Sequence, residues 1–192
     1  VVFGLGEEAG AALTKHPGVS RISFTGSVPT AKKIAKAAAD NLTPVSFELG
    51  GKSPLIVLDD ADLDLATTLA VEQYDNGGQV CLSGTRILVH QKIVEKFTAL
   101  FVEKARQIKQ GDPRIEDIQI GPQIHSDHFA RISGFVERAK NEGAKILLGG
   151  EPNEELGGLF YQPTLVMNPD INSEIFRDEI FGPVLCVQTF ST

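Results

Sequence analysis

The chain has no tryptophan, a single methionine and only two cysteines among its 192 residues. Cys81 and Cys186 do not make a disulfide framework, so we expect a reducing compartment and a cytoplasmic location. The four histidines show no metal-ligand spacing, and the sequence predicts no metal site. No apolar run approaches the ~20 residues that cross a bilayer, and the first residues do not resemble a signal peptide. We therefore expect no membrane partner.

Basic residues are scarce as well. The 18 lysines and arginines are outnumbered by 25 aspartates and glutamates, which gives a net charge of −7 and argues against nucleic acid as a partner. What the sequence does contain is typical of a globular protein with a core, since 42% of its residues are hydrophobic and 22% are charged. The length suits one domain or parts of two. Because the chain begins at Val1 and not at a methionine, we expect a piece of a longer protein.

Short apolar runs alternate with helical patterns, which predicts an α/β fold built on a mainly parallel sheet. Ser27 and Pro29 suit the cap and first turn of one helix. The apolar run 54–58 predicts a buried strand, and the last strand should leave an uncovered sheet edge. The expected strands are 19–24, 45–49, 54–58, 86–90, 146–148, 161–167 and 184–190, and the expected helices are 31–41, 63–76, 93–108 and 129–139.

The best domain boundary lies at Gly50-Gly51. These two glycines follow a predicted strand, and they allow a backbone hinge or a close approach of other backbone. We therefore divide the chain into residues 1–50 and residues 51–192.

One candidate binding segment is Phe24-Thr25-Gly26-Ser27, in which a strand leads through glycine into a helix. The free backbone N–H groups and the dipole of a helix N-terminus favour a phosphate at such a turn. An ordinary strand-to-helix turn would have the same pattern, so this segment alone leaves both interpretations open.

A candidate base is Glu48, which interrupts the apolar strand 45–49. Buried carboxylates without partners are costly, and partial burial raises the pKa of a carboxyl group toward the range of a general base. The alternative is a glutamate on the solvent face of the strand.

A candidate nucleophile is Cys81, which follows the polar, glycine-rich turn Asn76-Gly77-Gly78-Gln79. Cysteine reacts as its thiolate, which needs access and a favourable local field. Many free cysteines are buried and inert instead. That second description suits Cys186, which stands in the apolar run 184–187.

The run Gly4-Leu5-Gly6-Glu7-Glu8-Ala9-Gly10 only partly matches a dinucleotide fingerprint. Its glycine spacing is one residue too long for the Rossmann motif. Two glutamates would also repel a pyrophosphate. We interpret this run as a turn and a helix start that packs and does not bind.

Four segments in order resemble the aldehyde dehydrogenase superfamily, in its NAD(P)-dependent, hydrolytic branch. They are the cofactor turn at 24–27, the glutamate signature at 48–54, the cysteine signature at 76–81 and the later cofactor motif at 179–184. The resemblance covers essentially the whole chain. It implies an α/β fold with the C-terminal part of a Rossmann-like cofactor domain in 1–50 and most of an α/β catalytic domain in 51–192, truncated at its C-terminus.

The resemblance implies oxidation of an aldehyde to a carboxylic acid, with NAD or NADP as the hydride acceptor. Cys81 would attack the aldehyde to form a thiohemiacetal, which loses hydride to become a thioester, and Glu48 would activate the water that hydrolyses it. The backbone N–H of Cys81 would stabilise the oxyanion. Relatives of this kind are homodimers or homotetramers, and the aldehyde itself is not readable from the sequence.

The same resemblance assigns cofactor contacts. Gly26 and Ser27 would lie at the pyrophosphate, and the Leu49 backbone would face the nicotinamide carboxamide. Glu179 would hold the nicotinamide ribose and Phe181 would lie against the ring. Arg131, with His128 near it, falls where the family places residues near a cofactor ribose.

Two alternatives remain open. A CoA-acylating or phosphate-dependent relative would transfer the acyl group without a water-activating base, and Glu48 favours the hydrolytic branch. A non-catalytic relative used for binding or structure would be expected to lack Cys81 or Glu48, and both are present. A cysteine hydrolase pairing Cys81 with His90 or His125 has no supporting signature. Because family segments on both sides are absent, we expect the isolated chain to be poorly active.

Overall fold

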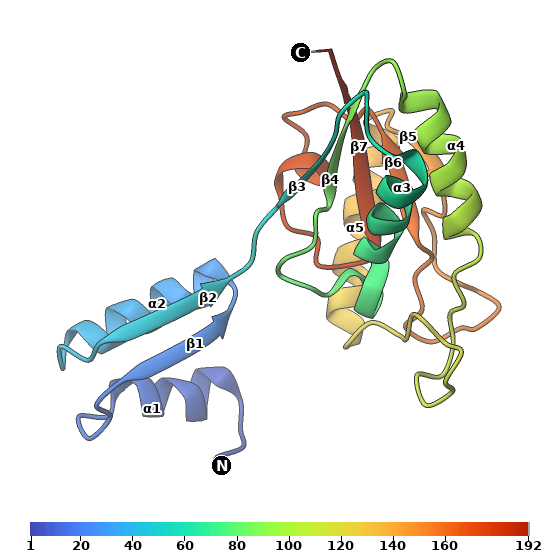
Figure 1. The fold of residues 1–192 in the computed structure, drawn as a ribbon. Coiled ribbons are helices and arrows are strands. Elements are labelled where there is room, and N and C mark those ends of the chain that lie inside the picture. Colours follow the sequence, from blue (N-terminus) through green and yellow to red (C-terminus); the bar gives the residue numbers. More distant parts are fainter. Residues whose placement is uncertain (192) are drawn as a thin grey trace. The chain divides into compact units, whose positions relative to one another are not determined.

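The computed structural model describes residues 1–191. The chain divides into two compact units, Val1–Gly50 and Gly51–Thr192 (Figure 1). The α/β prediction is confirmed, because parallel strands alternate with helices in both units. No helix within residues 1–191 is long and apolar enough to cross a membrane.

The first unit is a thin layer of helices beside two parallel strands. It contains η1 (Gly6–Gly10), α1 (Ala11–Lys15), β1 (Ile22–Gly26), α2 (Val28–Ala39) and β2 (Val45–Leu49). Ser27 caps α2 as predicted, because its hydroxyl accepts a hydrogen bond from the Thr30 N–H at 3.5 Å, and Pro29 lies in the first turn.

The second unit is built on a five-stranded sheet. Its strands are β3 (Pro54–Val57), β4 (Arg86–His90), β5 (Lys145–Leu148), β6 (Thr164–Met167) and β7 (Val184–Phe190), in the order β3-β4-β7-β6-β5. All neighbours are parallel except β5 and β6, which are antiparallel.

The strand order corrects two expectations. The last strand, β7, is central, since it pairs with β4 on one side and β6 on the other. One edge is instead occupied by β3, where Ile56 is 59% exposed and only Val57 is buried. An apolar run predicts a strand, but its place in the sheet depends on which distant segments pair with it.

Helices cover both faces of this sheet (Figure 1). α3 (Leu63–Val71) and α4 (Val94–Ala105) pack on one face, where Phe97 and Phe101 meet Leu185 and Val187. α5 (Ser126–Asn141) and the short α6 (Glu174–Arg177) pack on the other, where their apolar residues meet Val184 and Cys186. Successive side chains of β7 thus point into the cores on opposite faces of the sheet. This is the alternation expected of a pleated strand with helices on both sides.

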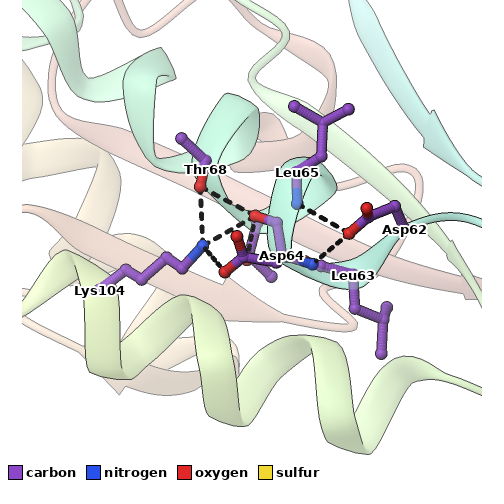
Figure 2. Close-up of polar contacts among 7 residues, drawn as sticks. Asp62, Leu63, Asp64, Leu65, Thr68 and Lys104 are labelled. Atoms are coloured by element: carbon purple, nitrogen blue, oxygen red, sulfur yellow. Dashed lines mark hydrogen bonds and ion pairs between the residues drawn. The ribbon is translucent and has the colours of Figure 1, made fainter.

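Polar contacts fix α3 against α4 (Figure 2). Asp62 caps α3, since one carboxylate oxygen accepts the N–H groups of Asp64 and Leu65 at 3.0 and 3.1 Å. The Lys104 ammonium on α4 donates to the Asp64 carboxylate, the Asp64 carbonyl and the Thr68 hydroxyl, each at 2.7 Å. This anchoring holds the helix from which the cysteine loop emerges.

Candidate active site

The loop that carries Cys81 begins where α3 ends. The chain passes through η2 (Glu72–Gly78), whose last three residues are left-handed, with φ of 50° at Asn76, 64° at Gly77 and 72° at Gly78. Glycine adopts this conformation without a steric penalty, and asparagine tolerates it better than most residues. The glycine-rich turn of the sequence therefore reverses the chain just before the cysteine.

This loop rests on backbone of the segment 179–183. A Cβ atom at Gly78 would lie 2.0 Å from the Gly182 carbonyl oxygen, so only glycine allows the approach. At the preceding residue of the loop, the Gly77 carbonyl accepts a hydrogen bond from the Gln123 side chain at 3.2 Å. Sequence reasoning missed Gln123 and gave Gly182 no role of its own within the motif 179–184, because a partner 46 or more residues away leaves no local signal.

The two cysteines differ as predicted. Cys81 is exposed and Cys186 is buried. The Cys186 thiol donates to the Ile175 carbonyl at 3.4 Å, and burial raises its pKa to about 11. Within residues 1–191 the backbone N–H of Cys81 donates no hydrogen bond, so it can bind an oxyanion.

Glu179 lies beside the start of the second unit. One oxygen of its half-buried carboxylate accepts the Gly51 N–H at 3.2 Å. A Cβ atom at Gly51 would stand 3.9 Å from the Cys81 carbonyl oxygen. The structure thus brings together Gly51, the Cys81 loop and Glu179 from three distant parts of the sequence.

Phe181 and Arg131 are also part of this region. Phe181 is 36% exposed and has a left-handed φ of 59°. Arg131, on α5, donates to the backbone carbonyls of Glu179 and Ile180, each at 2.6 Å. The nearby His128 ring bonds to the Phe181 carbonyl at 2.6 Å.

A cavity of about 750 Å³ opens on one side of the cysteine loop. Val80 and Leu82, which flank Cys81 in the sequence, line it together with Tyr74. The acidic residues Glu72 and Asp75 line it too. Apolar, polar and acidic residues thus share the lining of this cavity.

A buried lysine follows Gly51 and was not singled out from the sequence. Burial lowers the pKa of the Lys52 ammonium, which lies among the charges of Arg86, Asp178 and Glu179. Its nitrogen has no hydrogen-bond partner within residues 1–191. The only sequence signal was its place directly after the two glycines.

The remaining predicted residues lie in the first unit. Glu48 is exposed on β2, so the expectation of partial burial is wrong, and the solvent-facing alternative describes the position. Its strand belongs to a two-stranded sheet, which has too little cover to bury both faces. Gly26 of β1 is paired with Leu49 of β2, so the Ser27 turn and Leu49 share one edge of this sheet.

The glycine run that only partly matches a dinucleotide fingerprint contains the π-helical turn η1 (Gly6–Gly10). This turn leads into α1 and has no buried residue. Among residues 1–191, no group of three or more histidine, cysteine, aspartate or glutamate side chains is arranged to hold a metal ion.

The sequence profile of the Aldehyde dehydrogenase family matches residues 1–192. The chain belongs to the aldehyde dehydrogenase family. The family inferred from the four motifs is thereby confirmed.

Individual relatives of this aldehyde dehydrogenase chain support the same family assignment. A chloroplastic aminoaldehyde dehydrogenase of Arabidopsis thaliana is 45% identical, as is the peroxisomal aminoaldehyde dehydrogenase 2 of Pisum sativum. Each alignment covers 100% of this chain and 39% of the relative. A crystal structure of betaine aldehyde dehydrogenase from Staphylococcus aureus in complex with NAD+ is 40% identical, with a TM-score of 0.95, and covers 100% of this chain and 39% of that one. The chain thus spans 39% of the length of these relatives.

These relatives correct the expected location. Two of them, both 45% identical, are chloroplastic and peroxisomal, so the prediction of a cytoplasmic protein is wrong. Cysteine content reports a reducing environment at best, and several compartments share that property.

Proposed function

We propose that this chain supplies the nucleophile and part of the cofactor site of an NAD(P)-dependent enzyme that oxidises an aldehyde to a carboxylic acid. The observation that carries the proposal is the exposed Cys81 on a loop seated against the segment of Glu179. Residues 1–50 would form the end of the cofactor domain, and residues 51–192 most of the catalytic domain. The whole protein would be a homodimer or homotetramer.

The residues present fit a dinucleotide. Glu179 uses one oxygen for the Gly51 N–H, and within residues 1–191 its other oxygen accepts no hydrogen bond, so it is available to a ribose hydroxyl. The Ser27 turn begins α2, and the first amides of a helix suit a phosphate. NAD(P)+, when bound, accepts a hydride.

The chain's own residues would perform the remaining steps. The Cys81 thiolate adds to the aldehyde carbon, and the oxyanion of the thiohemiacetal is stabilised by the free Cys81 N–H. Loss of hydride leaves a thioester on Cys81. Glu48 then takes a proton from water, which attacks the thioester, releases the carboxylic acid and returns the thiolate.

The substrate we propose is an aldehyde that carries an amino or quaternary ammonium group. Relatives of this chain are aminoaldehyde and betaine aldehyde dehydrogenases. The cavity beside the cysteine loop supports this class, because Glu72 and Asp75 on its wall complement a positive charge.

Substitutions in the full-length enzyme test the mechanism. Cys81→Ser should lower kcat by at least about 1,000-fold, whereas Cys186→Ser, which keeps a donor for the Ile175 carbonyl, should leave kcat within about twofold. Glu48→Gln should give a burst of NADH close to one equivalent, followed by slow turnover. Unchanged steady-state turnover in Glu48→Gln would assign the water-activating role to another group.

We further propose that the isolated 192-residue chain is poorly active. Steady-state turnover with aminoaldehydes, measured beside the full-length enzyme, tests this. A kcat for the isolated chain within about tenfold of the full-length value would contradict the proposal.

A further inference from the structure

The segment Glu179-Ile180-Phe181-Gly182 adopts a costly conformation. Phe181 has a φ of 59°, in the left-handed region that bulky residues rarely enter. Such a residue is strained and persists only where its surroundings enforce it. The segment lies between α6 and β7 and has no helical or strand hydrogen bonds of its own.

α5 supplies the constraint. Three consecutive carbonyls each receive a side-chain donor, with Arg131 Nη2 on Glu179, Arg131 Nη1 on Ile180 and His128 Nε2 on Phe181, all at 2.6 Å. A carbonyl oxygen only accepts, so the His128 ring carries its hydrogen on Nε2.

The two clamping residues are themselves held. The backbone N–H of His128 donates to Nδ1 of the His125 ring, at the start of α5, at 3.1 Å. The Arg131 guanidinium lies over the Phe135 ring, 4.8 Å from its centre. A Cβ atom at Gly182 would be 2.5 Å from Ile132, so α5 and the segment are in close contact.

The opposite side of the segment faces the proposed chemistry. The Gly182 carbonyl packs directly against Gly78, at the start of the Cys81 loop. The Glu179 carboxylate receives the Gly51 N–H. The segment is therefore held between α5 on one side and the cysteine loop on the other.

We propose that His128 and Arg131 are positioning residues, which clamp the 179–181 backbone and thereby orient the Glu179 carboxylate for the cofactor. This rests on the proposed function, in which Glu179 binds a cofactor ribose. It gives Arg131 a second role beside the ribose contact that the family resemblance implies. Each terminal nitrogen of its guanidinium donates one N–H to a backbone carbonyl, in a planar fork that a lysine ammonium does not have.

The test compares four single variants and one double variant of the full-length enzyme. Arg131→Met removes both arginine hydrogen bonds, and Arg131→Lys keeps a single cation. Glu179→Gln reports the carboxylate itself. Arg138→Met is the matched control, because Arg138 stands on the same helix and over the same Phe135 ring, at 5.0 Å, but pairs with Glu174.

Steady-state kinetics should show a selective loss. We expect the KM for NAD+ to rise by at least about tenfold in Arg131→Met and by a smaller factor in Arg131→Lys. In both Arg131 variants the KM for the aldehyde should stay within about twofold of wild type. In Arg138→Met the KM for NAD+ should also stay within about twofold. The Arg131→Met and Glu179→Gln double variant should be no worse than Glu179→Gln, because Arg131 acts through Glu179.

Hydrogen exchange without cofactor separates positioning from direct contact. Arg131→Met should speed exchange of the Gly51 amide and of the amides in 179–183, whereas a residue that only touches the cofactor would leave them unchanged. A lower melting temperature with an unchanged NAD+ KM would reduce the clamp to a structural role and overturn the proposal. If Glu179→Gln leaves the NAD+ KM unchanged, the assigned role of Glu179 in the proposed function fails instead.

Discussion

The two units of the chain differ sharply in how much they bury. In the second unit, helices cover both faces of a five-stranded sheet, and two clusters of buried side chains meet its central strands. In the first unit, within the described residues, only Ala31, Ala38 and Thr43 are buried. Phe3 and Leu42 are about nine-tenths exposed there, at 91% and 88%. A two-stranded sheet with so little cover is marginally stable by itself.

This difference separates the residues of the proposed site into two groups. Cys81, Glu179 and Arg131 belong to the unit with a dense core, where close backbone contacts and short hydrogen bonds hold them. Glu48 and Ser27 belong to the thin unit. Within this chain, therefore, the nucleophile is better held than the base and the phosphate turn.

Hydrogen exchange should give the largest contrast. Amides of β4 and β7 are in the core, and we expect them to exchange at least about 1,000-fold more slowly than amides of β1 and β2, because opening the first unit uncovers little apolar surface. Mass spectrometry of the isolated chain measures both sets together. Similar protection in the two sheets would break the comparison.

Gly78→Ala should be the most damaging glycine substitution in the second unit. The new Cβ atom would lie 2.0 Å from a backbone oxygen at a φ of 72°, and we expect a loss of about 3 kcal/mol or more in the free energy of unfolding. Gly143→Ala is the control, since its φ is 85° but nothing lies within 4 Å. It should cost about 1 kcal/mol. Urea unfolding measures both, and equal losses would contradict the close packing of the cysteine loop.

Alkylation should sharpen the contrast within the second unit. Cys81 is exposed, whereas Cys186 is buried with a pKa raised by burial to about 11. At neutral pH we expect iodoacetamide to label Cys81 at least about 100-fold faster than Cys186. Peptide mass spectrometry measures the two labelling rates. Equal rates in the native protein would favour a non-catalytic relative, and in urea the two rates should converge.

Alkaline pH should give the smallest effect, and only in the second unit. Both tyrosines, Tyr74 and Tyr161, are buried there, and burial raises their pKa values above the ordinary 10.0. The folded state thus holds these protons more tightly than the unfolded state, so its stability is full below pH 10 and falls as the pH rises further. The loss is about 1.4 kcal/mol per pH unit for each tyrosine. Ultraviolet absorbance should show no tyrosinate before unfolding, and earlier ionisation would show that the phenols are accessible.

Local pattern was enough to find most elements. The strands at 45–49, 86–90 and 184–190 have the predicted bounds, because each is a continuous apolar or alternating run. The cap at Ser27 was also predicted correctly, since a cap depends on residues a few positions apart. Strand order was not predictable in this way, and the edge and central positions of β3 and β7 were exchanged.

The sequence by itself therefore determined the elements, the family and the contrast between Cys81 and Cys186, because each of these rests on neighbouring residues or on motifs in order. Only the tertiary structure decided that Glu48 is exposed, that Gly51 meets Glu179 across 128 residues, and that Arg131 clamps a backbone 48 and 49 residues away. Hydrogen-bond partners so distant are chosen by how helices and strands pack, and no short window of sequence contains that information.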